Sequence, residues 1–181
     1  CCVANTAQVG DVIAVTVRSA ALRWAARSDD AAPMTDRRRR LIDRHMRPRP
    51  RVDAGRAAVE SGIRCAIDVS DGLVQDLGHV CAASNVGAEL RLGDVPQDAD
   101  LVAACPDDAL EMAATGGEDY ELIVVGAEGA IARASAAVEG GFTVVGRIVD
   151  GDARVHVLDA AGAEVSLPSG GWDHLRKDRA Q

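Results

Sequence analysis

Aromatic side chains are almost absent from this sequence, which contains one Phe, one Tyr and two Trp among 181 residues. Hydrophobic residues nevertheless make up 48% of the chain and charged residues 27%, a balance typical of a folded domain and not of a disordered one. Because aromatics are so few, we expect a core built mainly from Ala, Val, Leu and Ile. The length suits one ordinary domain and is too short for two full ones.

Positive charge is also scarce, with 20 Lys and Arg against 28 Asp and Glu and a net charge of −8. Such a surface repels phosphate backbones, so the composition argues against general binding to nucleic acid or to acidic membranes. The sequence has no apolar run near the roughly 18 residues of a membrane span, and it does not open with a signal peptide. We therefore expect a cytoplasmic protein that contacts no membrane.

The cysteines do not form a C-x-x-C pair, and an odd number of them suggests neither a disulfide framework nor a zinc site. We expect buried free thiols in a reducing compartment. The cysteines are Cys1, Cys2, Cys65, Cys81 and Cys105. Because the first residue is Cys and not Met, we also expect a processed chain or a piece of a longer one.

The spacing of apolar residues predicts strands and helices that alternate without a strict βαβ repeat. The predicted strands cover residues 12–17, 65–69, 88–92, 118–125, 142–149 and 155–158. The predicted helices cover residues 20–26, 36–47, 51–60, a segment that begins after Gly72, 107–114 and 127–139. This order indicates an α+β fold with a mostly antiparallel sheet packed against helices.

The first candidate site is Asp68-Val69-Ser70-Asp71-Gly72, between a predicted strand and a predicted helix. A carboxylate in an apolar strand is costly unless it is paired or binds a metal, and here a second carboxylate follows it. Two carboxylates near a helix N-terminus can hold Mg²⁺, and the free amides there suit phosphate oxygens. The alternative, which these local features favour when taken alone, is ordinary helix capping by Ser70 or Asp71.

Two further segments combine glycine with polar or aromatic residues. Gly-Gly-Glu-Asp-Tyr-Glu at residues 116–121 is either a flexible turn with an acidic edge or a strand end at which Glu118 or Asp119 hydrogen-bonds a ligand. Gly-Gly-Trp-Asp-His at residues 170–174 surrounds Trp172 with small and polar neighbours. Trp172 either anchors the end of the domain or stacks on a planar ring of a ligand.

Basic residues gather between positions 37 and 51, first as four consecutive arginines and then as an alternating Pro and Arg sequence. We favour a solvated helix face followed by an extended segment, the ordinary explanation of a charge run. Binding of anions or nucleic acid is the alternative, but the aromatic residues that would stack on bases are missing.

In order and spacing, four motifs together resemble the C-terminal half of thiamine-monophosphate kinases, relatives of the aminoimidazole ribonucleotide (AIR) synthetases. They are Arg-His-x-x-Pro-x-Pro-Arg at 44–51, Asp-Val-Ser-Asp-Gly-Leu-x-x-Asp-Leu-x-His at 68–79, Gly-Gly-Glu-Asp-Tyr-Glu-Leu at 116–122 and Gly-Trp-Asp-His at 171–174. Gly-Asp-x-Ile-x-Val-Thr at 10–16 is similar to the first strand of that domain.

The resemblance implies a PurM/AIR synthetase-like C-terminal domain and a kinase that transfers the γ-phosphoryl group of ATP to thiamine monophosphate, giving thiamine diphosphate. Transfer in this family is direct and Mg²⁺-dependent, so no residue is expected to act as a nucleophile. Matched motif by motif, Asp68 and Asp71 are expected to bind Mg²⁺ and Ser70 to contact ATP. Glu118 and Trp172 are expected to contact the substrate.

Some details stay open at this point. Glu121 is the alternative to Glu118 as the substrate contact. The family enzymes are homodimers, but the oligomeric state of this chain is not predicted. The chain itself is either part of such a kinase, a non-catalytic ligand-binding or relic domain of the same fold, or a related ATP-dependent synthetase of the AIR or selenophosphate type.

We expect residues 9–175 to form the domain, with residues 1–8 as the remnant of a preceding linker or N-terminal domain and 176–181 as a tail. In the family, the N-terminal domain carries further Mg²⁺-binding aspartates and much of the ATP pocket. We therefore expect the 181-residue chain alone to be inactive.

Overall fold

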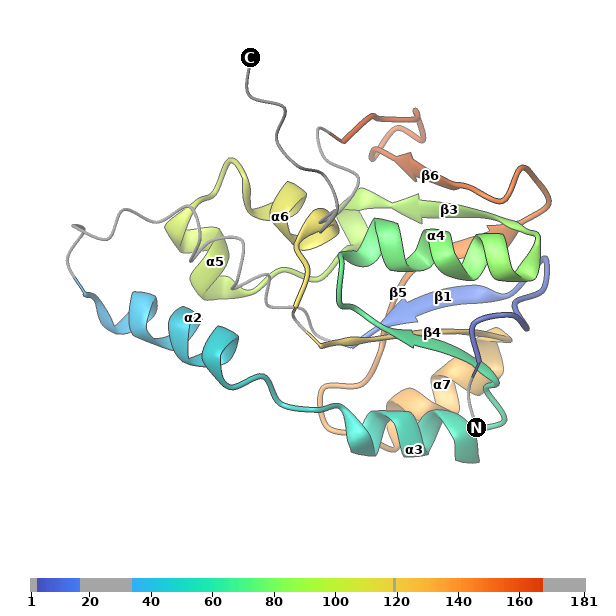
Figure 1. Cartoon of the computed structure of the whole chain (residues 1–181), viewed down its shortest axis with the longest axis horizontal. Helices are drawn as coiled ribbons and strands as arrows, with labels where there is room; N and C mark the ends of the chain where they lie inside the picture. Colours follow the sequence, from blue (N-terminus) through green and yellow to red (C-terminus); the bar gives the residue numbers. More distant parts are fainter. Residues whose placement is uncertain (1–2, 17–33, 119, 168–181) are drawn as a thin grey trace, which may run out of the picture.

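A single six-stranded sheet organises the protein, seen here in a computed structural model that describes residues 3–16, 34–118 and 120–167 (Figure 1). The strands are β1 (Val12–Val15), β2 (Cys65–Asp68), β3 (Gly87–Arg91), β4 (Leu122–Gly126), β5 (Thr143–Val149) and β6 (Val155–Leu158). Their order across the sheet is β2-β4-β1-β5-β3-β6; of these strands, β3 and β6 pair in parallel and the other neighbours pair antiparallel. The predicted α+β fold with a mostly antiparallel sheet is confirmed.

Helices cover both faces of the sheet, with α4 over one face and α3 and α7 packed together against the other (Figure 1). The helices are α2 (Asp36–Met46), α3 (Val52–Glu60), α4 (Leu73–Ser84), α5 (Ala99–Ala104), α6 (Ala109–Thr115) and α7 (Glu128–Ala136). A short 3-10 helix, η1 (Leu92–Asp94), follows β3. A separate apolar cluster, Leu41, Leu101, Ala109 and Met112, joins α2, α5 and α6.

The central strands are buried on both faces because their apolar residues are consecutive. In β1, Ile13 and Val15 point to the α4 side, whereas Ala14 packs with α3 and α7. The core consists almost entirely of Ala, Val, Leu and Ile, as predicted from the scarcity of aromatics. The single Phe, Phe142, lies at the edge of the α3–α7 cluster.

Most predicted elements are present, but one predicted strand begins too early and one helix was not predicted. The predicted strand 118–125 begins only at Leu122, because Glu118 and Tyr120 have left-handed backbone conformations with φ of 60° and 52°. Helix α5 was not predicted at all. It is capped by Asp98, whose side chain accepts the N–H groups of Asp100 and Leu101. The predicted helix 20–26 and the end of the predicted strand 12–17 lie outside the described residues.

The buried thiols agree with the prediction for the described cysteines. Cys65 and Cys81 are free and buried, and Cys105 is free and half-buried. Burial raises the pKa of the Cys81 thiol to about 11, so it stays protonated and unreactive at neutral pH. Within the described ranges, no helix has both the length and the apolar composition needed to cross a membrane.

A histidine between two carboxylates makes the stability of the β6 edge dependent on pH. His156 Nδ1 lies 3.0 Å from a carboxylate oxygen of Glu164, and Nε2 lies 3.2 Å from one of Asp152. The hydrogen bond to Glu164, followed by that to Asp152, raises the pKa of His156 above 6.5. Protonated His156 stabilises the folded state through its contacts with the two carboxylates. Because the folded-state pKa is raised, this stabilisation is complete below pH 6.5 and is lost as the pH rises through the folded-state pKa.

We therefore expect His156→Gln to lower the melting temperature below pH 6.5 and to have little effect well above the folded-state pKa. Melting curves of both proteins across this range test the prediction, and NMR titration of the imidazole gives the folded pKa directly. A folded pKa at or below 6.5 would contradict it.

Candidate functional site

The turn between β2 and α4 is held from inside the helix by Asp76. One carboxylate oxygen of Asp76, Oδ2, accepts the backbone N–H groups of Ser70 at 2.9 Å, Asp71 at 3.0 Å and Gly72 at 3.1 Å. The residue before α4 is Gly72, and no side chain there caps the helix. Helix capping by Ser70 or Asp71, the alternative left open from the sequence, is therefore wrong.

Asp76 is only 2% exposed, which is unusual for a carboxylate. Burial raises its pKa, while the hydrogen bonds from the three backbone N–H groups oppose the rise and the nearby charge of Asp71 adds to it. The carboxylate is tolerated in the interior because its hydrogen bonds are made there. It fixes the turn that carries Ser70 and Asp71.

The segment at residues 116–121 lies directly against this turn. Glu118 N–H donates to the carbonyl of Ser70 at 2.7 Å, and Tyr120 N–H donates to the carbonyl of Val69 at 3.1 Å. In return, Val69 N–H donates to the carbonyl of Glu121 at 2.8 Å. Two motifs that are about fifty residues apart in the sequence therefore form one continuous backbone surface at the end of β2.

Two glycines make this close approach possible. A Cβ atom on Gly117 would lie 2.3 Å from the carbonyl oxygen of Ser70, and one on Gly72 would lie 2.7 Å from that of Thr115. Both distances are too short for any side chain, and Gly72 also has a φ of 127°. Gly117 and Gly72, one in each motif, are thus required by the contact between the two motifs.

Glu118 and Glu121 have different environments. Glu121 is buried, and Arg51 holds it with two hydrogen bonds, Nε to Oε2 at 2.8 Å and Nη2 to Oε1 at 2.6 Å. The hydroxyl of Thr16 donates to the same carboxylate and accepts Leu122 N–H at 2.9 Å. Glu121 therefore ties the end of β1, the start of α3 and the start of β4 together.

Asp68 is the last residue of β2 and is exposed. Together with Tyr120 it lines a cavity of about 340 Å³, whose other lining residues are Pro48, Pro50, Arg51, Gly55, Glu121 and Leu122. Glu118 is half-buried and lies in the adjacent turn. Trp172 and Asp119, both singled out from the sequence, lie outside the described residues.

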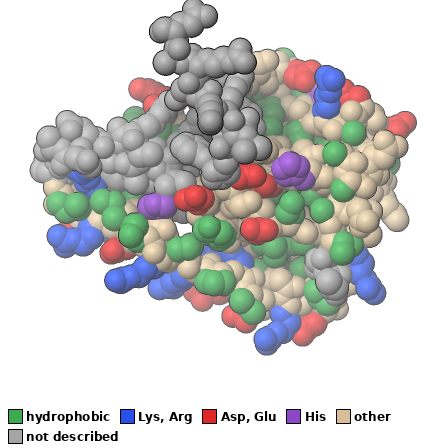
Figure 2. Space-filling model, in the orientation of Figure 1, with side chains coloured by type: hydrophobic (Ala, Val, Ile, Leu, Met, Phe, Trp, Pro, Cys, Tyr) green, Lys and Arg blue, Asp and Glu red, His purple; other side chains and the backbone are tan. Residues whose placement is uncertain are grey.

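The structure adds two residues to which the sequence assigned no role. Asp71, Asp76 and His79 each offer one ligand atom, and these atoms lie within 4.8 Å of one another. Asp76 and His79 belong to the Asp-Leu-x-His part of the second motif, so their spacing of one helical turn was the available signal. Figure 2 shows acidic side chains beside a histidine near the middle of the α4 face.

Two members of this group, Asp71 and Asp76, offer carboxylate oxygens and the third offers an imidazole nitrogen, whereas Asp68 is not part of the group. Mg²⁺ prefers oxygen ligands and usually takes one or two carboxylates, with water and phosphate oxygens filling the remaining positions. Asp68 and Asp71 offer such carboxylates on either side of Ser70. Asp76 is less available because its Oδ2 already accepts three N–H groups.

Known proteins with similar sequences and folds identify the family of this chain. Residues 8–159 match the family described as AIR synthase related protein, C-terminal domain. The chain is 40% identical over 140 residues to a thiamine-monophosphate kinase from Escherichia coli, covering 75% of this chain and 42% of the relative. It is 35% identical over 160 residues to the one from Mycobacterium tuberculosis, covering 83% and 44%. The chain therefore spans less than half the length of these relatives.

Solved structures agree with the sequence comparison. A thiamine-monophosphate kinase from Stenotrophomonas maltophilia is 34% identical with a TM-score of 0.76, covering 91% of this chain and 54% of that one. A structure of AaThiL complexed with AMPPCP and TMP is 25% identical with a TM-score of 0.75, covering 96% and 54%. The HypE-HypF complex, at 15% identity and a TM-score of 0.65, shares the fold.

These matches confirm the resemblance predicted from the motifs, and they agree with the fold, in which a mostly antiparallel sheet carries the turns of both motifs at the end of β2. The matched residues include β1 through β6 and all the helices between them. The chain belongs to the family of AIR synthase related proteins, of which it contains the C-terminal domain.

Proposed function

We propose that this chain provides part of the site at which a thiamine-monophosphate kinase transfers the γ-phosphoryl group of ATP to thiamine monophosphate. The observation that carries the proposal is the joining of two polar motifs at the end of β2, where Asp76 fixes one turn and backbone hydrogen bonds attach the other. Relatives named thiamine-monophosphate kinase, and a related structure complexed with AMPPCP and TMP, support this pair of ligands.

In the proposed site, Asp68 and Asp71 bind Mg²⁺ and Ser70 contacts ATP. A bound Mg²⁺ would neutralise charge on the phosphate oxygens, which is most of what phosphoryl transfer requires besides positioning. The protein contributes two carboxylates on a turn that cannot move freely, because Asp76 binds three of its backbone N–H groups. Pre-organised charge of this kind is more effective than charge on a mobile loop.

Glu118 and Trp172 are the proposed substrate contacts. The choice of Glu118 over Glu121 is supported by the partners of Glu121, whose carboxylate is occupied by Arg51 and Thr16. Glu118 lies in the turn that touches Ser70 through its backbone, so a ligand bound there would be near the proposed ATP contact.

The proposal extends to the whole enzyme. We propose that residues 9–175 act as the C-terminal domain of a cytoplasmic kinase, with residues 1–8 as a remnant of what precedes it and 176–181 as a tail. Because the chain spans less than half of its relatives, we expect no thiamine diphosphate formation by the 181-residue chain alone.

A chimera tests this function. In it, the chain replaces the matching segment of the Escherichia coli relative, and thiamine diphosphate formation is measured with ATP and Mg²⁺. We expect an active chimera in which Asp71→Asn lowers kcat by at least about 100-fold, since removal of one well-placed electrostatic group has effects of that order. The control is Asp107→Asn, a matched change at an exposed aspartate away from the turn. Equal activity of the two variants would contradict the role of Asp71.

Substitution of Trp172 in the same chimera tests the substrate contact. Stacking or cation–π contact between an indole and the thiamine rings is worth roughly 0.5–2 kcal/mol. We expect Trp172→Ala to weaken binding of thiamine monophosphate by about tenfold, the equivalent of roughly 1.4 kcal/mol, and to leave ATP binding nearly unchanged. A lower melting temperature together with equal losses for both ligands would instead show that Trp172 anchors the end of the domain.

A further inference from the structure

The Arg47–Arg51 segment between α2 and α3 has a backbone that its two prolines restrict. Pro48 and Pro50 fix their own φ near −65°, and each disfavours the α-helical conformation in the residue before it, as in Arg47 with φ of −140° and ψ of 65°. The residues before the two prolines are Arg47 and Arg49. The segment is therefore a rigid support for guanidinium groups, which lose little backbone freedom when a ligand binds.

Its arginines differ in their partners. Arg51 is bound through two hydrogen bonds to the buried carboxylate of Glu121, and Arg44, at the end of α2, is paired with Asp98. Arg47 and Arg49 are exposed and have no carboxylate partner within the part of the chain that the structure describes. Among the described residues, these two positive charges therefore have no carboxylate to neutralise them, although the net charge of the protein is −8.

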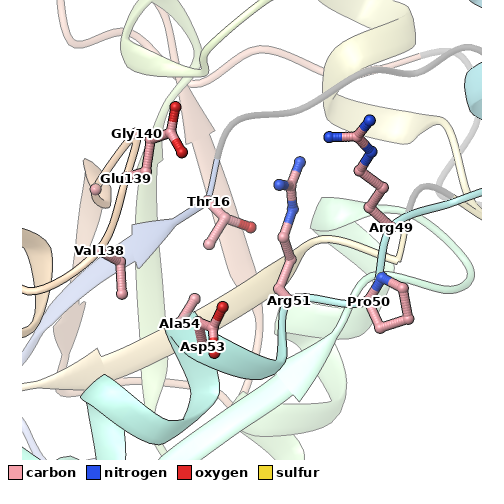
Figure 3. A pocket seen from close by; sticks show the side chains of 10 residues that line it. Thr16, Arg49, Pro50, Arg51, Asp53, Ala54, Val138, Glu139 and Gly140 are labelled. Atoms are coloured by element: carbon pink, nitrogen blue, oxygen red, sulfur yellow. The ribbon is translucent and has the colours of Figure 1, made fainter.

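These arginines face a cavity of about 680 Å³, which is lined by Arg44, Arg47, Arg49 and Arg51 together with Asp43, Pro48 and Glu121. Arg49 and Arg51 also line a second cavity of about 520 Å³, and Figure 3 shows their side chains extending in the same direction from either side of Pro50. Arginine side chains are visible along the edge of the molecule formed by α2 and α3 (Figure 2).

The arginine cavity adjoins the candidate site. Pro48, Arg51 and Glu121 line both this cavity and the one that contains Asp68. An anion held by Arg47 and Arg49 would thus be next to the end of β2 and its carboxylates. Arginines and a carboxylate that line adjoining cavities fit a ligand whose phosphate is bound both by arginine and by a cation.

We propose that Arg47 and Arg49 bind the phosphate group of a small phosphate ester that occupies this opening. Guanidinium groups recognise phosphate oxygens through paired, charge-assisted hydrogen bonds, and two of them on a rigid segment suit a single phosphate. The site's existence is argued from the arginines alone, whereas the choice between a thiamine phosphate and a nucleotide as the ligand rests on the proposed function.

The test measures the binding of small phosphate compounds to the 181-residue chain in the absence of metal. Binding is monitored through the NMR signals of the arginine side-chain N–H groups during a titration. The probes are inorganic phosphate, thiamine monophosphate, ATP and unphosphorylated thiamine. We expect the phosphate-bearing probes to shift the Arg47 and Arg49 signals and thiamine not to do so. The double substitution Arg47→Gln with Arg49→Gln is expected to weaken this binding by about tenfold or more.

The matched control is Arg64→Gln, which removes the same charge at the opposite end of β2 from Asp68. Unchanged melting temperatures establish that each variant is folded. A larger response to thiamine monophosphate than to ATP identifies the thiamine phosphate as the ligand, and the reverse identifies the nucleotide; either supports the site.

Three results would overturn the inference: no phosphate-dependent shift, equal weakening by the Arg64 control, or a much stronger response to a long polyanion such as heparin than to any small phosphate. These outcomes do not test the proposed function, because the proposed function is tested by the activity of the chimera with and without Asp71→Asn. An inactive Asp71→Asn chimera with intact phosphate binding, for example, supports both.

Discussion

We expect Asp76→Ala to lower the free energy of unfolding by about 3 kcal/mol or more, since leaving a buried N–H group unpaired costs about 1–3 kcal/mol. The carboxylate is 2% exposed and accepts the N–H groups of Ser70, Asp71 and Gly72, so all three lose their acceptor at once. Denaturant unfolding gives the stability, and hydrogen exchange at the three amides shows whether the loss is centred on the turn.

Asp53→Ala is the matched control, because Asp53 also lies in the first turn of a helix but is exposed. Its loss removes only a favourable interaction with the helix dipole, worth about 0.3–1 kcal/mol. Asp76→Asn keeps one oxygen acceptor and is expected to fall between the two. Equal losses for Asp76→Ala and Asp53→Ala would contradict the role given to Asp76.

Arg51→Ala is the second substitution with a large expected effect, about 3 kcal/mol, because it leaves the Glu121 carboxylate buried without its cation. This is the lower end of the range for buried pairs, since the Arg51 side chain is 39% exposed whereas that of Glu121 is 4% exposed. Arg51→Lys keeps the charge but not the two-pronged contact, so it should recover only part of the stability.

The control for Arg51 is Arg91→Ala. Arg91 forms a salt bridge with Asp94, and the two side chains are 60% and 45% exposed. Exposed pairs contribute about 0–1 kcal/mol, so this change should be close to neutral. A double-mutant cycle of Arg51→Ala with Glu121→Gln separates the pair from the individual side chains. A coupling energy near zero would show that the contact between Arg51 and Glu121 does not stabilise the protein, which would contradict the prediction.

Local sequence signals predicted the regular elements well wherever a local cause exists. Thr35 caps α2 by accepting the Arg38 N–H at 3.1 Å, as its position before Asp36 indicated. The spacing of Leu73, Leu77 and Val80 placed α4. The strand predicted from Glu118 failed because apolar spacing does not reveal a left-handed backbone, which here follows from contact with a distant turn.

The candidate site was predicted in part. Asp68, Ser70 and Asp71 were recognisable as polar residues at a strand-to-helix junction, but the reason for their rigidity was not. Asp76 reads as an ordinary polar residue in the first turn of a helix, and its burial depends on the segment that folds over it. The pairing of β3 with β6 and the approach of the 116–121 segment are likewise long-range, so no local pattern contains them.

The basic residues between positions 37 and 51 were interpreted as a solvated helix face, which is correct only in part. Three arginines of α2 have the exposed side chains expected of a solvated helix face; they are Arg37, Arg40 and Arg44. They nevertheless pair with Asp98 and Asp100, at the start of a helix that was not predicted from the sequence. The hydrogen bond from Arg40 lowers the pKa of Asp100, so the contact persists at moderately acidic pH. This contact joins α2 to α5.

The position at which a divalent cation binds tests the proposed metal site most directly. Mn²⁺ takes the same oxygen ligands as Mg²⁺, and its unpaired electrons broaden nearby NMR signals. In a titration of the 181-residue chain with Mn²⁺ and AMPPCP, the amide signals of Ser70, Asp71 and Gly72 should broaden first. The acidic cluster around His156 provides an internal comparison at the opposite edge of the sheet. Broadening that begins there, or that spares residues 70–72 throughout, would contradict the proposed metal site.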